Sequence, residues 1–160
     1  MSESSADNTR YILPAMLIVG GIVFFNKLME ALGLSKDKDE TAVDENRDKT
    51  LAEALAAAEK IAPSTKTAAE WVVIADQIYA DLKHSSIDDD KDDAGYQLAR
   101  VKNDTDVYKL IMAFGTRTEY GFGLPIGKGP LSYFVVGNLS DTAINVVNDN
   151  YRRKGIKFQW

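Results

Sequence analysis

An uninterrupted apolar run near the N-terminus constrains this chain more than any other feature of its sequence. The run extends from Tyr11 to Phe25 and lies between two cations, Arg10 and Lys27. A helix that spans a bilayer needs about 20 mostly apolar residues, and continuation through the segment LMEALGL supplies that length. The long side chains of the two cations can extend their charged ends to the membrane interfaces. We therefore expect a transmembrane helix and stem over residues 11–34, preceded by a polar head at residues 1–10.

Two other interpretations of the apolar run are a cleaved signal peptide and a buried core helix. A cleaved signal peptide needs a positive leading region and a small-residue cleavage site, whereas the head carries two acids against one arginine and no A-x-A follows the run. A buried core helix stays open as an alternative, although no other segment is apolar enough to surround one. More Lys and Arg residues follow the run than precede it, which by the positive-inside rule places the C-terminal part on the cytoplasmic or virion-interior side.

Composition limits what the rest of the chain can be. With 160 residues and 45% apolar content, the chain has room for one ordinary domain beyond the anchor and a linker. The net charge of −5 argues against a nucleic-acid partner, which would require a basic excess. The absence of cysteine and the single histidine, His84, leave neither thiolate sites nor a His-rich metal site. We expect no cofactor.

The remaining sequence predicts a linker followed by helices. Residues 35–50 alternate charges rapidly and offer little to bury, which is typical of a solvated linker; a helical stem is possible there, but not a packed one. Thr50-x-x-Glu53 and Thr67-x-x-Glu70 are capping boxes that start helices. The expected helices run from Thr50 to Pro63, from Thr67 to near His84, from the cluster Asp88–Asp93 to about Val101, from about Asp104 to Gly115, from Leu131 to Leu139, and from Ser140 or Asp141 to Gly155.

The apolar residues of these helices recur at three- and four-residue spacing, which predicts one buried face on each. The predicted core positions are Trp71, Ile74, Ala75, Ile78, Leu82, Ala94, Leu98, Val101, Val107, Leu110, Ile111, Phe114, Ile144, Val147 and Tyr151. The tail IKFQW either adds one strand or pins its apolar side chains onto the helices. The prediction is an all-α domain over residues 51–160, a compact bundle of about five short helices.

The segment from Thr116 to Pro130 contains four glycines and two prolines, and we expect it to be irregular. Its pattern GFGLPIGKGP is not a phosphate-binding loop, because the positions that would need Gly and Ser or Thr hold Phe122 and Gly129. It nevertheless carries four large apolar residues. Long loops in compact domains are usually functional or disordered, and disorder does not favour such residues. We therefore predict that Tyr120, Phe122, Leu124 and Ile126 bind a partner, the alternative being that they fill the domain's own core.

Three charged groups are weaker candidates. The acidic cluster Asp88–Asp93 lacks the Gly and Glu positions of an EF-hand and is either a capped helix start or a weak cation site. Acid pairs such as Asp104 and Asp106, or Glu119, suggest hydrolase carboxylates, but a sequence this acidic supplies such pairs by chance. The basic end, Arg152, Arg153 and Lys154, either contacts lipid headgroups or an acidic partner or complements the dipole of the last helix.

Two resemblances add expectations. The helix order from Thr67 to Gly155, with an acidic turn after the first long helix and a final RRKGI, resembles an annexin-type helical repeat. The annexin calcium turn G-x-G-T is replaced by HSSIDDD, so the family's calcium and phospholipid binding does not carry over. The whole layout of anchor, charged stem and cysteine-free helical domain resembles small single-anchor structural proteins of bacteriophages, including those with an internal membrane.

Together these observations predict a membrane-anchored structural or tethering protein rather than an enzyme. The expected partners are the lipid bilayer and a protein assembly, such as a capsid or an envelope complex. The alternative is a membrane-associated, carboxylate-based hydrolase.

Overall fold

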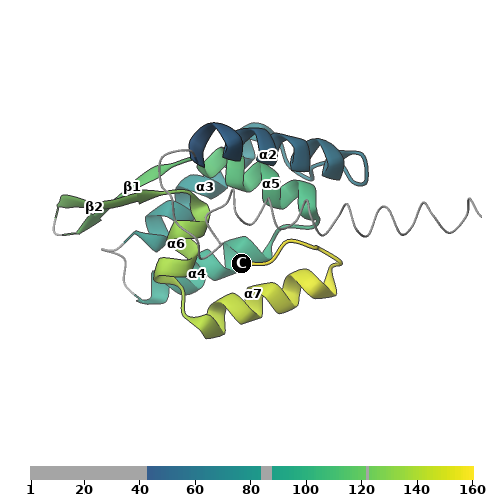
Figure 1. The fold of residues 1–160 in the computed structure, drawn as a ribbon. Coiled ribbons are helices and arrows are strands. Elements are labelled where there is room, and N and C mark those ends of the chain that lie inside the picture. The colour runs from purple at the N-terminus through teal and green to yellow at the C-terminus, as the bar shows by residue number, and fades with distance from the viewer. Residues whose placement is uncertain (1–42, 84–87, 122) are drawn as a thin grey trace, which may run out of the picture.

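The computed structural model describes residues 43–83, 88–121 and 123–160. Within these residues the chain is mainly helical, with one small two-stranded sheet (Figure 1). The elements in chain order are α2 (Val43–Glu59), α3 (Ala68–Leu82), α4 (Asp88–Ala99), α5 (Asp104–Phe114), β1 (Arg117–Gly121), β2 (Leu124–Gly129), α6 (Leu131–Asn138) and α7 (Asp141–Arg153).

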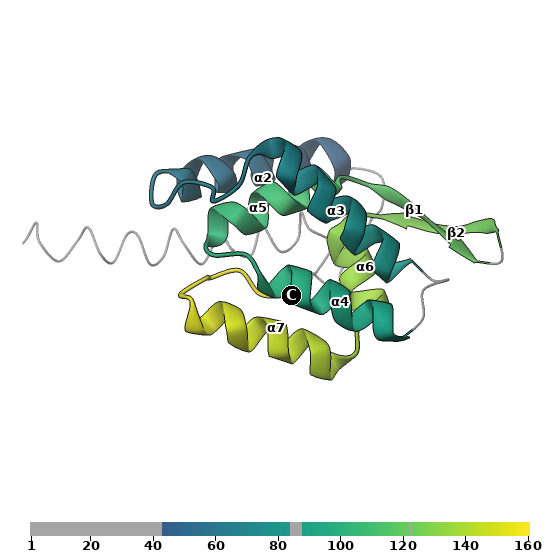
Figure 2. The ribbon, with the colours of Figure 1, turned by 180° about the vertical axis from the view of Figure 1, so that it is seen from behind.

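Helix α3 lies at the centre of the packing. It contacts α4, α5 and α6, while α2 covers α5 and α7 covers α4. Figures 1 and 2, which show opposite sides, place α2 and α5 along one side of the domain and α7 along the other. The core between them contains every predicted stripe residue as a buried side chain, except Ile74 and Ile144, which pack against its margin half-buried.

Side-chain caps begin three of these helices. Thr67 and Glu70 form the predicted capping box of α3, Asn103 accepts from the backbone N–H of Asp106 in α5, and Ser140 caps α7. Each cap satisfies an N–H group that the first turn of a helix leaves without a partner. These predicted starts are confirmed.

Helix α2 begins earlier than predicted. It starts at Val43, so Thr50 lies inside the helix and not at its N-terminus, and the C-terminal half of the expected linker 35–50 is helical. Glu, Lys and Arg are good helix formers, so a charged stretch can extend a helix whose later turns are packed. Those later turns contribute four buried residues to the core, Leu51, Ala54, Leu55 and Ala58.

The expectation of an irregular segment at 116–130 is wrong. Strands β1 and β2 form an antiparallel hairpin, with Arg117 opposite Gly129 and Gly121 opposite Leu124, and with an irregularity between Glu119 and Tyr120. Glycine and proline lower strand propensity, but tertiary contacts decide the outcome in a sheet this small. The fold is therefore a helical bundle with a hairpin and not strictly all-α.

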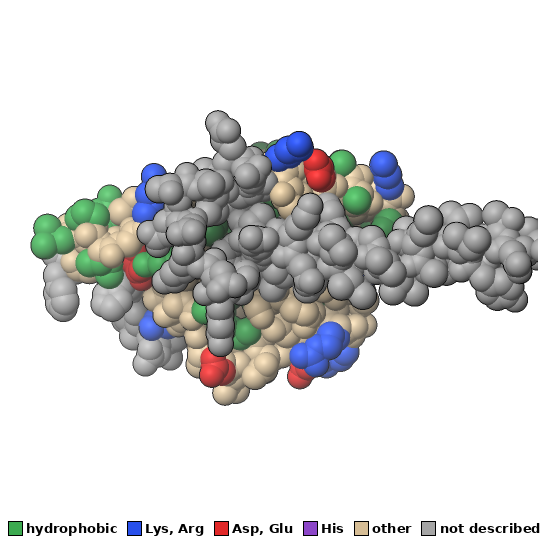
Figure 3. Space-filling view, viewed as in Figure 1, with side chains coloured by type: hydrophobic (Ala, Val, Ile, Leu, Met, Phe, Trp, Pro, Cys, Tyr) green, Lys and Arg blue, Asp and Glu red, His purple; other side chains and the backbone are tan. Residues whose placement is uncertain are grey.

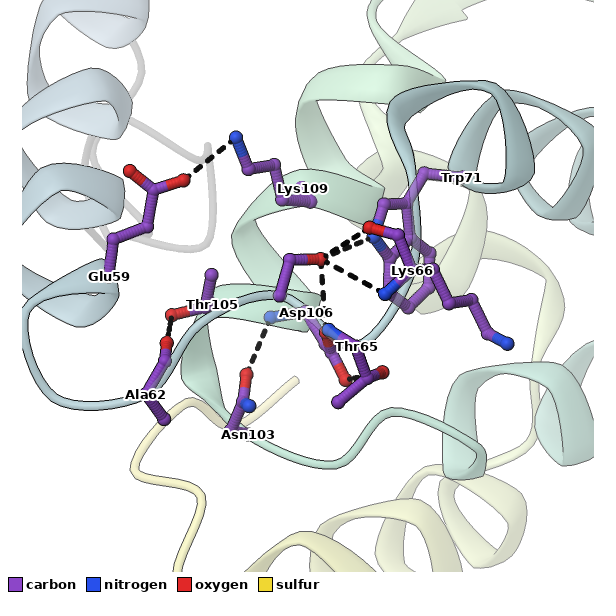
Figure 4. Close-up of polar contacts among 10 residues, drawn as sticks. Glu59, Ala62, Thr65, Lys66, Trp71, Asn103, Thr105, Asp106 and Lys109 are labelled. Atoms are coloured by element: carbon purple, nitrogen blue, oxygen red, sulfur yellow. Dashed lines mark hydrogen bonds and ion pairs between the residues drawn. The ribbon is translucent and has the colours of Figure 1, made fainter.

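The loop between α2 and α3 is fastened to α5 by a buried carboxylate (Figure 4). Asp106 is fully buried and accepts hydrogen bonds from Thr65 N at 2.8 Å, Thr65 Oγ1 at 2.7 Å and Lys102 N at 2.9 Å. Ser64 Oγ donates to the same carboxylate at 3.3 Å and accepts from Trp71 Nε1. The Asp106 side chain thus connects the α2–α3 loop, the residues between α4 and α5, and α5 itself.

The C-terminal tail pins onto the helices and forms no strand. Ile156 and Phe158 are buried, and the backbone N–H groups of Lys157 and Phe158 both donate to Asp104 Oδ1. Trp160 packs edge-on against Phe158. Of the two predicted roles for the tail, the structure shows the second.

The predicted membrane segment, residues 11–34, lies outside the described residues, as do His84 and Phe122. Among the residues that are described, no helix combines the length and apolar character that crossing a bilayer requires.

Candidate functional site

The candidate hydrolase carboxylates are engaged in holding the fold. Asp104 accepts from two backbone N–H groups of the C-terminal tail, and Asp106 fastens the α2–α3 loop. Glu119 is buried at the base of the hairpin, where it accepts hydrogen bonds from Tyr133 Oη at 2.8 Å and Asn138 Nδ2 at 3.4 Å. Oxygen atoms occupied in this way are poorly placed to act as a general base or a nucleophile.

The acidic cluster Asp88–Asp93 forms the first turns of α4. This placement puts the acids at the positive end of the helix dipole, which they complement. Within the described ranges, no group of three or more His, Cys, Asp or Glu side chains is placed to hold a metal ion.

The basic residues at the end of α7 have different surroundings. Lys154 Nζ donates to the backbone carbonyls of Ala99 and Val101, at the C-terminal end of α4. Burial lowers the pKa of the Lys154 ammonium group, and the nearby charges of Lys102 and Arg153 lower it further. Lys154 thus caps a neighbouring helix.

Arg152 and Arg153 are exposed on the same end. Arg152 forms a surface ion pair with Asp149 at 2.7 Å, and Arg153 donates to the backbone carbonyl of Asp149. Their contact with lipid headgroups or an acidic partner stays a prediction.

The base of the hairpin is fixed on one side by Arg117. Its guanidinium lies 4.9 Å from the ring centre of Tyr79 and 4.6 Å from that of Phe114, and it pairs with Asp76 at 2.7 Å. Tyr79 Oη also donates to the backbone carbonyl of Thr118 at 2.5 Å. Cation–π contacts and a charge-assisted hydrogen bond together hold β1 against α3 and α5.

On the other side, Tyr133 of α6 lies against β2. A Cβ atom at Gly129 would come within 2.4 Å of the Tyr133 ring, and one at Gly127 within 2.1 Å of its hydroxyl oxygen. The two glycines are therefore required by a close approach and not by a turn. The hydrogen bond from the Tyr133 hydroxyl to Glu119 is the main cause that raises the pKa of this tyrosine, with desolvation and the charge of Glu119 adding to it.

Beyond this base, the hairpin carries an exposed apolar group that we call the hairpin tip: Tyr120, Leu124, Pro125 and Ile126. Tyr120, Leu124 and Ile126 are 48%, 68% and 54% exposed, and Pro125 is exposed as well. Figure 3 shows hydrophobic side chains gathered on the projecting hairpin. Of the four residues predicted to bind a partner, three lie here and none of these three fills the core; Phe122 lies outside the described residues.

The hairpin tip differs from the other exposed apolar side chains. The other large ones are distributed over several elements, and scattered apolar residues of this kind are normal on a protein surface. They are Ile61 after α2, Val72 and Val73 on α3, Tyr96 on α4, Met112 on α5, Tyr133 and Val136 on α6, and Val146 on α7. The hairpin tip gathers four such residues on a projection with a fixed base. That arrangement is suited to contact with an apolar surface.

Sequence reasoning found the exposed residues of this site but missed the residues that present them, Arg117, Glu119, Tyr133, Gly127 and Gly129. One signal was available. Tyr120, Phe122, Leu124 and Ile126 alternate with other residues at a period of two, which is the pattern of a strand pair.

Comparison of the chain with protein-family models, with curated proteins and with solved structures finds no match.

Proposed function

We propose that this protein is a single-pass membrane tether that holds a small helical domain beside a bilayer and presents the hairpin tip as its contact surface. The observation that carries the proposal is an exposed apolar projection on a base fixed by Arg117 and Tyr133. Ordering a flexible loop on binding costs conformational entropy, whereas a braced hairpin has lost that entropy already.

The tether in this proposal is the apolar run at residues 11–25, with its stem to residue 34. The proposed anchor is supported by the continuation of the run to residue 34, which gives the length of a spanning helix, by the cations at the ends of the run and by the absence of acids within residues 11–25. The basic residues that follow it favour a domain on the cytoplasmic or interior side.

The proposed role is structural. The layout of an anchor, a charged stem and a compact helical domain resembles that of small bacteriophage structural proteins, and we propose that the domain links a membrane to a capsid or envelope assembly. The alternative, a carboxylate-based hydrolase, gains no support from Asp104, Asp106 or Glu119, because each is bonded into the fold.

Flotation with phosphatidylcholine vesicles tests the tether. We expect the full chain to rise with the vesicles and to stay with them at high salt, because apolar insertion is not screened by ions. A variant that lacks residues 11–25 should stay at the bottom of the gradient. A variant that lacks residues 1–9 is the matched control, since it removes polar residues from the same end and should float. A full chain that is monodisperse without detergent and does not float would contradict the proposal.

A further inference from the structure

We propose that the hairpin tip docks into the headgroup region of the bilayer in which the chain is anchored. The domain then contacts the membrane surface through its hairpin. This inference rests on the proposed anchor at residues 11–34 and adds a second membrane contact. It identifies the partner of the hairpin as lipid and not as protein.

The chain enters the domain toward the end from which the hairpin projects. In both Figure 1 and Figure 2, the dark-blue start of α2 lies toward the end of the domain from which the hairpin projects, and α2 runs from there toward the opposite end. The eight residues from 35 to 42 connect the anchor to Val43. Fully extended they reach roughly 29 Å at most. The anchor therefore keeps the hairpin end of the domain near the membrane surface.

The second argument is the length of the hairpin. β1 has five residues, which at about 3.3 Å each gives a strand of roughly 16 Å. Arg117 and Glu119 belong to the fixed base, so the part of the hairpin that projects beyond the bundle is shorter than the strand and lies within the distance that the connecting residues allow. The hairpin tip can therefore reach the headgroup region without any rearrangement of the bundle.

The third argument is the chemistry of the hairpin tip. Tyrosine suits a membrane interface because its ring is apolar and its hydroxyl is polar, and leucine and isoleucine suit the upper acyl chains. The segment from Tyr120 to Gly129 contains no acid and one cation, Lys128, which is exposed. The carboxylate that immediately precedes this segment in the sequence, Glu119, is buried and accepts a hydrogen bond from Tyr133. Nothing on this part of the hairpin opposes contact with phosphate headgroups.

Unpaired backbone groups limit how deeply the hairpin can enter the membrane. Peptide groups without partners are costly in the hydrocarbon core, so a two-stranded hairpin should stop at the headgroups and not cross the membrane. Pro125 has no N–H group, which lowers the number of unpaired donors at the tip. The expected depth is therefore interfacial.

The small size of the hairpin tip favours lipid over protein as its partner. A standard protein interface uses about 20–30 residues on each side, whereas the hairpin tip has four. Contact with a bilayer needs no shape complementarity. Because the anchor already holds the domain beside the membrane, docking is an intramolecular step, and even a weak contact is well populated.

A single fluorescent label tests this inference. The chain has no cysteine, so Ile126→Cys gives one attachment site for an environment-sensitive dye at the hairpin tip. Ile61→Cys is the matched control, because Ile61 is 81% exposed and lies two residues after the last residue of α2, whose end lies away from the hairpin (Figure 2). Both full-length proteins are reconstituted into phosphatidylcholine vesicles, with thermal melts to verify that the labels leave the fold intact.

We expect the dye at position 126 to shift its emission to shorter wavelength, to lose quenching by aqueous iodide and to gain quenching by brominated lipid. The dye at position 61 should behave as in water. If the protein floats with vesicles but iodide quenches both dyes equally, docking is overturned while the anchor stands, and the hairpin tip is free for a protein partner. If neither protein floats, the anchor is wrong and this inference fails with it.

Discussion

At the scale of single residues, Asp106 shows how one side chain can join distant segments. It lies in the first turn of α5, yet its oxygen atoms accept from Thr65, from Ser64 and from the backbone of Lys102. A cap such as Asn103 is recognisable from the sequence because its partner is three residues away. The bond between Asp106 and Thr65 spans 41 residues, so nothing local in the sequence indicates it.

Asp106→Asn should lower the free energy of unfolding by about 2–3 kcal/mol. The amide replaces one accepting oxygen by an NH₂ donor, which then faces donors inside the protein and leaves them without a partner. Asp149→Asn is the control, because that carboxylate is exposed and its ion pair with Arg152 should contribute no more than about 1 kcal/mol. Urea unfolding of the two variants measures the difference. Equal, small losses would mean that water replaces the buried hydrogen bonds of Asp106.

At the scale of elements, local chemistry predicts the helices of the bundle, whereas the hairpin is indicated only by the two-residue alternation of its apolar side chains. Helix starts and buried faces follow from local chemistry, such as the Thr67–Glu70 capping box and the stripe from Trp71 to Leu82. The segment 116–130 contains glycines, and glycine disfavours both helices and strands. Two of them, Gly127 and Gly129, are in fact fitted to the ring of Tyr133. That contact exists only after α6 has folded back onto β2, so the residues alone do not reveal it.

Gly129→Ala should lower the free energy of unfolding by about 1–3 kcal/mol, because its Cβ would overlap the Cβ and Cγ atoms of Tyr133, which cannot swing away. In the background of Tyr133→Gly, which removes both of these atoms, the same change should cost much less, and a double-mutant cycle measures this coupling. Gly137→Ala is the control: nothing lies within 4 Å of the added Cβ, and alanine in a helix is neutral or stabilising. Additive losses at positions 129 and 133 would contradict the close contact.

At the scale of the whole molecule, the folded domain begins earlier in the sequence than the charge pattern predicts. The expected linker at 35–50 suggests a boundary near Thr50, but α2 starts at Val43 and its later turns cover α5. The charged start of α2 and its packed end belong to one helix. Only the residues before Val43 therefore connect the proposed anchor to the domain. Because this connection is short, the hairpin end stays close to the membrane in our proposal.

The contribution of α2 can be measured by truncation. A fragment of residues 43–160 keeps every contact described above and should show one cooperative, mainly helical melt by circular dichroism. A fragment of residues 60–160 keeps five helices, the hairpin and the loop that Asp106 fastens, but lacks α2 and with it the burial of Leu51 and Leu55. Two buried leucines contribute roughly 3–6 kcal/mol, which is a large share of the 5–15 kcal/mol or so that stabilises an ordinary domain. The loss of the ion pair between Glu59 and Lys109 adds little, since both side chains are partly exposed.

We therefore expect the shorter fragment to melt at a markedly lower temperature or without cooperativity. If the two fragments melt alike, α2 belongs to the stem and the folded unit begins at the loop that Asp106 fastens.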